Sequence, residues 1–97
     1  MERKQKFEVT YKVDVVVGDT VIDPDNCTSI AFENLGTKTA YVLDVIPVVP
    51  NKIREFNNEP GCVILQKFRI DYRGQYNPLQ KNTEQIIVTK TFTRPIS

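Results

Sequence analysis

Hydrophobic and polar residues alternate strictly over residues 7–17, in the run Phe-Glu-Val-Thr-Tyr-Lys-Val-Asp-Val-Val-Val. Every odd position in this run is apolar, and every even position except Val16 is polar. Successive side chains of a strand point to opposite faces, so this period of two predicts a β-strand with one buried and one solvent-facing side. We expect the odd-numbered side to pack against the core of a small antiparallel β domain.

The remaining sequence indicates further short strands separated by turn residues. We expect the segment Asn34–Lys38 to be a hairpin loop in which Gly36 adopts a positive φ. Several short strands without a helical window predict a small antiparallel β-sandwich of about six or seven strands, connected like a Greek key. The other expected strands cover residues 20–23, 28–33, 39–46, 62–72 and 83–93.

Alternation within these strands also predicts which side chains face the core. The inward residues are expected to be Ile30, Phe32, Ile64, Phe68, Ile70, Tyr72, Ile86, Val88 and Phe92. Thr89, Thr91 and Thr93 then lie on a side that faces solvent or a neighbour.

Residues 39–46 are apolar on both sides of the expected strand, which is typical of a central strand or of a surface that covers a partner. We therefore place Val42 and Ile46 on an outer, interface-forming side. Pro47 and Pro50 lack amide donors, so residues 47–50 are expected at a sheet edge or in a crossover. Ile53 and Phe56, three residues apart, fit either one helical turn or a short strand.

The composition limits the classes of function. A chain of 97 residues is one domain, which we divide into a polar N-terminal arm at residues 1–6 and a sandwich at residues 7–97. A net charge of +1 argues against nucleic-acid binding. No window reaches the ~18 apolar residues of a membrane helix, so no membrane partner is expected. The basic residues Arg3, Lys4 and Lys6 form either a solvated terminus or an arm that docks on an acidic neighbour.

No catalytic constellation is visible. The chain has no histidine, and Cys27 and Cys62 have no neighbouring base. We therefore expect no enzyme, no cofactor and no metal site. Asp19, Asp23 and Asp25 surround a turn, but their spacing matches no calcium-binding loop. The start of the chain does not resemble a signal peptide, so free buried thiols are expected, and a disulfide between the two cysteines stays open.

An aromatic and basic patch is expected in the loop after residue 71. Tyr72, Arg73 and Tyr76 suit either sugar stacking or a protein interface. The alternative is that these tyrosines lie over the core. The patch supports a carbohydrate-binding β-sandwich as the alternative function.

The segment from Ser29 to Tyr72 resembles small phage virion proteins. Its first part is Ile-Ala-Phe-Glu-Asn-Leu-Gly-Thr at residues 30–37, followed by Ala-Tyr-Val at 40–42 and a proline-bearing bend at 47–50. Its second part is Phe-Asn-Asn-Glu-Pro at 56–60, followed by Phe-Arg-Ile-Asp-Tyr at 68–72. These motifs are turns and core positions, and none is catalytic.

The resemblance implies a non-enzymatic structural protein of a bacteriophage particle, specifically a capsid auxiliary or decoration protein. Its partners would be the major capsid protein or other virion proteins, together with further copies of itself in a homo-oligomer. It would be assembled in the host cytoplasm and end in the virion.

Overall fold

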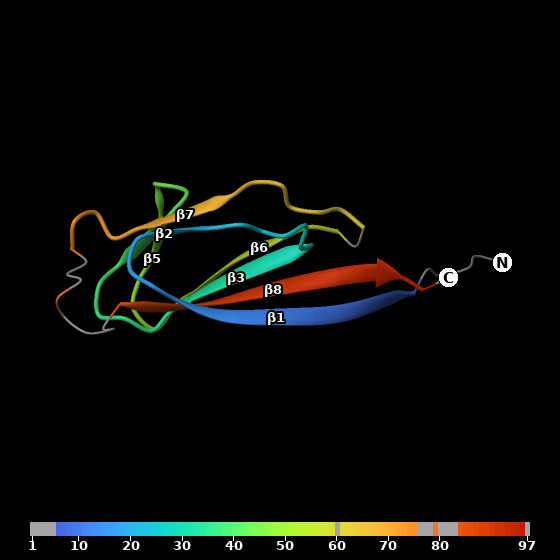
Figure 1. Ribbon diagram of the computed structural model, residues 1–97, viewed down its shortest axis with the longest axis horizontal. Coiled ribbons are helices and arrows are strands. Elements are labelled where there is room, and N and C mark those ends of the chain that lie inside the picture. The colour runs from blue at the N-terminus through green and yellow to red at the C-terminus, as the bar shows by residue number, and fades with distance from the viewer. Residues whose placement is uncertain (1–5, 60, 76–78, 80–83, 97) are drawn as a thin grey trace.

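The protein is an all-β sandwich of two four-stranded antiparallel sheets, as Figure 1 shows for a computed structural model that describes residues 6–59, 61–75, 79 and 84–96. The eight strands are β1 (Phe7–Val17), β2 (Thr20–Ile22), β3 (Ser29–Asn34), β4 (Ala40–Val42), β5 (Ile46–Val48), β6 (Ile53–Asn57), β7 (Phe68–Asp71) and β8 (Gln85–Pro95). The predicted antiparallel sandwich is confirmed, with one or two strands more than expected.

The strand order is β1-β8-β3-β6 in one sheet and β2-β7-β4-β5 in the other. Among the described strands, β4 and β5 are the only consecutive pair in one sheet, and every other consecutive pair is divided between the two sheets. Eight strands wound in this way form a jelly roll. The long strands β1 and β8 run side by side and extend past the rest of the sandwich (Figure 1).

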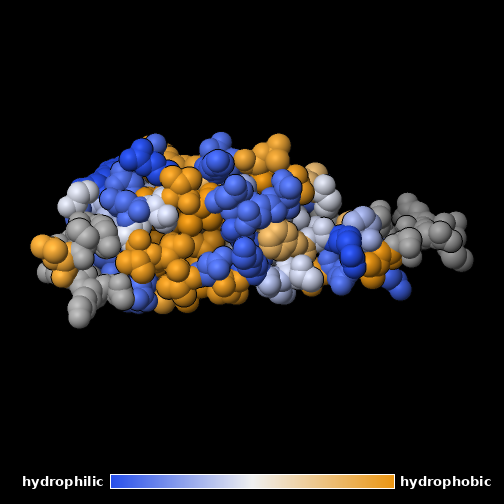
Figure 2. Space-filling model, in the orientation of Figure 1, coloured by the Kyte–Doolittle hydropathy of each residue, from blue (hydrophilic) through white to orange (hydrophobic). Residues whose placement is uncertain are grey.

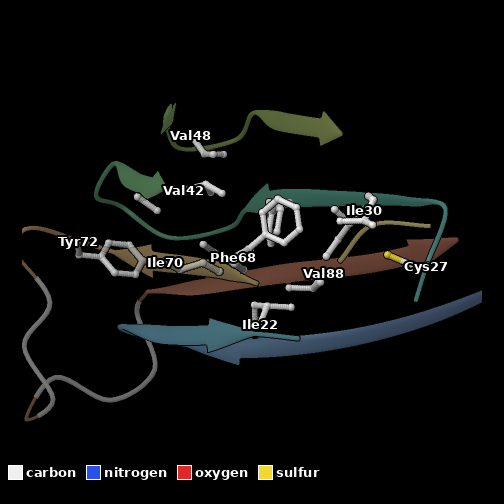
Figure 3. Close-up of a cluster of buried hydrophobic side chains, with 13 residues drawn as sticks. Ile22, Cys27, Ile30, Val42, Val48, Phe68, Ile70, Tyr72 and Val88 are labelled. Atoms are coloured by element: carbon white, nitrogen blue, oxygen red, sulfur yellow. The ribbon is translucent and has the colours of Figure 1, made fainter. Parts of the chain in front are cut away.

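The core lies between the sheets, where Figure 3 shows side chains from both sheets meeting. Phe32 on β3, Phe56 on β6 and Phe68 on β7 pack with ring centroids 5.2–6.1 Å apart, in tilted and edge-to-face geometries. Such contacts add specific packing to the hydrophobic burial. The predicted inward residues Ile30, Phe32, Ile64, Phe68, Ile70, Tyr72, Ile86 and Val88 are all buried, and Phe92 is partly buried.

The segment predicted as one strand at residues 39–46 is a hairpin. Val42 pairs with Ile46, and the chain reverses at Leu43 and Asp44, whose φ angles are +54° and +68°. Val42 is fully buried and Ile46 is partly buried against the core. The expectation that these two residues form an outer apolar side is therefore wrong, because the reversal turns both toward the opposite sheet.

Other segments differ in detail. Residues 34–38 cross from one sheet to the other instead of forming a hairpin, and Gly36 is not among the glycines with positive φ. Residues 53–57 form strand β6, which decides between the helical turn and the strand. Pro47 lies on β5, an edge strand as expected. In the segment 62–72 only Phe68–Asp71 is a strand.

Candidate interaction surface

The outer side of the β1–β8–β3–β6 sheet carries a row of exposed apolar side chains. They are the odd-numbered residues of β1 after Phe7, with exposed fractions of 46% for Val9, 68% for Tyr11, 59% for Val13, 57% for Val15 and 37% for Val17. We call these five residues the β1 ladder. Figure 2 shows hydrophobic side chains gathered along the lower edge of the molecule, where Figure 1 places β1.

The pairing of β1 with β8 determines which side of β1 faces outward. Val16 pairs with Ile86 and Asp14 pairs with Val88, and these two β8 residues are buried in the core. Residues opposite each other in a ladder share a side of the sheet, so the even-numbered residues of β1 point inward. The prediction of a buried odd-numbered side is wrong, because alternation gives two sides but not the one that meets the core.

The β1 ladder continues across the sheet onto β8. Val13 lies opposite Thr89 and Val15 lies opposite Ile87, and both β8 residues are half-buried on the outer side. Large contiguous apolar patches are rare on monomeric proteins and mark surfaces that bind another macromolecule. The predicted outward position of Thr89, Thr91 and Thr93 agrees with this arrangement.

Four of the five inward-facing residues of β1 are polar and exposed, so the second sheet does not cover most of this side. Lys90 of β8 is buried, and its Nζ lies 2.6 Å from Oδ2 of Asp25 in the β2–β3 loop. Lys12 lies opposite Lys90 in the pairing of β1 with β8, and its Nζ is 3.8 Å from the same oxygen. The hydrogen bond from Lys90, with the charges of Lys90 and Lys12, lowers the pKa of Asp25 despite partial desolvation.

A hollow of about 330 Å³ opens at the sheet edge between β1 and β2. Its walls carry Asp14, Asp23 and Lys90 beside Val21 and Ile22. This volume lies at the small end of the range for ligand pockets. The lining contains no nucleophile with an adjacent base, so we assign it no catalytic chemistry.

The predicted site residues are dispersed. Lys6 is exposed, whereas Arg3, Lys4 and Tyr76 lie outside the described residues. Tyr72 is fully buried between the sheets, which confirms its predicted inward position and rules out the reading that places it in an exposed patch. Its position at the end of β7, on the same side as Phe68 and Ile70, places it in the core.

Arg73 is exposed but engaged within the fold. Its guanidinium carbon lies 3.5 Å from the ring centroid of Tyr41, and its Nη2 donates a 2.8 Å hydrogen bond to the carbonyl of Asp44. These contacts fasten the end of β7 to the β4–β5 hairpin. Tyr72 is therefore not available to stack on a sugar, because it is buried. One face of the Arg73 guanidinium is already stacked on Tyr41.

The three aspartates act separately: Asp19 lies in the β1–β2 turn, whereas Asp23 and Asp25 lie in the β2–β3 loop. Asp19 accepts a hydrogen bond from the amide of Tyr72, Asp23 accepts one from the amide of Asp25, and Asp25 pairs with Lys90. Within the described residues, no three His, Cys, Asp or Glu side chains are grouped to hold a metal. Cys27 is buried and Cys62 is exposed, and both are free thiols.

Comparison of the chain with protein-family models, curated proteins and solved structures finds no significant match. The part of the chain that the structure describes contains no helix able to span a membrane.

Proposed function

We propose that this chain is a structural protein of a bacteriophage particle, a capsid auxiliary or decoration protein that acts through protein–protein contacts. The observation that carries the proposal is the β1 ladder, a row of exposed valines and one tyrosine on a strand of eleven residues. Such side chains suit contact with another protein better than catalysis. Its partners are the major capsid protein or other virion proteins, and its location is the virion.

Two further features support this proposal. The jelly roll is an architecture used by viral capsid and lectin domains, although a fold alone does not determine function. The motifs at residues 29–72 that resemble small phage virion proteins include core positions of the sandwich, such as Phe32 and Phe68. The carbohydrate-binding alternative has no comparable support, because Tyr72 is buried and Arg73 is stacked on Tyr41.

The test is whether the chain is part of a particle. Particles are purified on a density gradient from lysates of cells that carry this sequence, and an antibody against the chain is applied to each fraction. We expect the chain to sediment with the capsid fraction and to resist removal by high salt, because an apolar contact is not screened. Its absence from every particle fraction would overturn the proposal.

A matched pair of variants tests the surface. Val15 of the β1 ladder is 57% exposed, and Val45 in the β4–β5 hairpin is 72% exposed. Val15→Asp should abolish particle binding, whereas Val45→Asp, at a more exposed valine away from β1, should retain it. Equal binding by both variants would remove the β1 ladder from the contact.

A further inference from the structure

The free edge of β1 is the least protected sheet edge among the described strands. β2 and β5 are edge strands of three residues, and β5 contains Pro47. The fourth edge strand, β6, has five residues, including Arg54 and Glu55. β1 also carries charges, at Glu8, Lys12 and Asp14, but it is eleven residues long, contains no proline and keeps an unbroken register with β8. Its length and regularity therefore leave more backbone free to pair than any other edge among the described strands.

The backbone groups along this edge belong to the ladder residues. The amide of Gly18 donates to the carbonyl of Glu84, and the amide of Ile96 donates to the carbonyl of Lys6. Both bonds continue the register in which even-numbered residues of β1 exchange hydrogen bonds with β8. The odd-numbered residues therefore direct their N–H and C=O groups to the free edge, where none of the described strands pairs with them.

The side chains of β1 select the register of a pairing with itself. Only the odd-numbered residues of β1 direct backbone groups to the free edge. In an antiparallel pair of two β1 strands, odd-numbered residues must therefore lie opposite odd-numbered residues. A two-fold axis at Lys12 places the two copies of Lys12 opposite each other, and an axis at Asp14 does the same for Asp14. An axis at Tyr11 places Glu8 of one copy opposite Asp14 of the other. Like charges directly opposite are destabilising. Among registers that pair at least about seven residues, centres at Thr10 and Val13 remain.

The centre at Val13 pairs more of the strand. It joins residues 9–17 of both copies, whereas a centre at Thr10 joins residues 7–13. With Val13 at the centre, Lys12 of each copy lies opposite Asp14 of the other. A centre at Thr10 would instead use Glu8, which is already ion-paired with Arg94 of its own chain.

We infer that two copies of this chain join their β1 edges antiparallel about a two-fold axis at Val13, forming one continuous eight-stranded sheet. The inference deepens the proposed function, since the two β1 ladders then lie side by side as one larger apolar surface for the particle. Tyr11 of one copy pairs with Val15 of the other on that surface, an aromatic and β-branched pair that favours strand pairing.

The first experiment is the mass of the purified chain by light scattering after size exclusion. We expect twice the 11.2 kDa of the monomer. A monomer mass at ~1 mM chain, where weak association is still visible, overturns the inference. The measurement uses no particles, so a dimer that fails to bind particles would contradict only the proposed function.

Charge exchange tests the register. Lys12→Asp and Asp14→Lys each place two like-charge pairs across the edge and should raise the dimer dissociation constant by about tenfold. The double variant Lys12→Asp with Asp14→Lys restores opposite charges and should recover the wild-type constant. A double variant as weak as the single variants overturns this register, because in the Thr10-centred register residue 12 faces Glu8.

Disulfide formation between two different variants gives an independent test. Lys12→Cys and Asp14→Cys are each made with Cys62→Ser, which removes the exposed thiol. Residues opposite at a non-hydrogen-bonded site have Cα atoms about 4.5 Å apart, within the span of a disulfide. The mixture should form a covalent dimer on oxidation, while each variant alone stays monomeric on a non-reducing gel. Cross-linking of either variant alone to the same extent overturns the register.

Discussion

The Nζ atom of Lys90 lies 2.6 Å from Oδ2 of Asp25, joining the inner side of β8 to the turn between β2 and β3. The turn that presents Asp25 is tight, because the amide of Cys27 donates to the carbonyl of Pro24 and both Asp25 and Asn26 have positive φ. The side chain of Lys90 is 7% exposed, and the carboxylate of Asp25 is its ion-pair partner. The contact lets a lysine occupy the inward side of the sheet.

This ion pair should make stability depend on pH in the acid range. The hydrogen bond from Lys90, aided by the charges of Lys90 and Lys12, lowers the pKa of folded Asp25 from 3.8. Its stabilising effect is therefore present above pH 3.8 and is lost as the pH falls through the lowered value. Asp25→Asn should lower the free energy of unfolding at neutral pH, and the difference from wild type should vanish in acid.

Urea denaturation at a series of pH values measures this difference. Asp23→Asn is the matched control, because Asp23 only accepts a hydrogen bond from the amide of Asp25, which an asparagine oxygen can still accept. A difference between Asp25→Asn and wild type that stays constant into acid would contradict the assigned role of Asp25.

Asn34 should be the most sensitive polar residue of the β3–β4 crossover. Its Nδ2 donates to the carbonyls of Lys38 and Val48, each at 2.8 Å, and its Oδ1 accepts from the amide of Gly36. Asn34→Ala leaves the buried Val48 carbonyl and Gly36 amide without this partner, and should lower the free energy of unfolding by about 2–4 kcal/mol. Asn57→Ala on the exposed strand β6 should change it by less than about 0.5 kcal/mol. Equal effects in urea denaturation would refute this ranking.

The sequence was sufficient to predict the fold class and most of the core. Alternation is local information, and it located Ile30, Phe32, Ile86 and Val88 correctly. The hairpin at residues 42–46 was missed because Leu43 and Asp44 reverse the chain with positive φ, without a glycine to signal it. The sequence therefore predicts one strand at residues 39–46 where the structure has a hairpin.

The interaction surface was visible in the sequence but assigned to the wrong side. The run at residues 7–17 has bounds identical to β1, yet its apolar side faces outward. Only the pairing of β1 with β8, about eighty residues away in sequence, decides this, and such a register cannot be read from one strand alone. The apolar residues of β1 are consequently a surface, and Val42, expected at the surface, is core.

The two cysteines should differ in reactivity. Cys27 is fully buried, and desolvation raises the pKa of its thiol, so both its access and its thiolate fraction are low. Cys62 is exposed. Labelling with a thiol reagent should modify one site per chain in native buffer and two in urea, with Cys62→Ser abolishing the native reaction. Rapid native labelling of Cys62→Ser would contradict the burial of Cys27.

Exposed and buried valines should separate association from folding. Val13→Thr removes an apolar contact from the β1 ladder while keeping a β-branched residue, so the folded monomer should change by less than about 0.5 kcal/mol. Dimerisation and particle binding should weaken.

Val42→Ala removes buried methyl groups and should lower the free energy of unfolding by about 2–3 kcal/mol through lost burial and the cavity it leaves. Its folded fraction should still associate normally. Urea denaturation and light scattering on both variants measure the two quantities, and loss of association in folded Val42→Ala but not in Val13→Thr would return the interface to the β4–β5 hairpin.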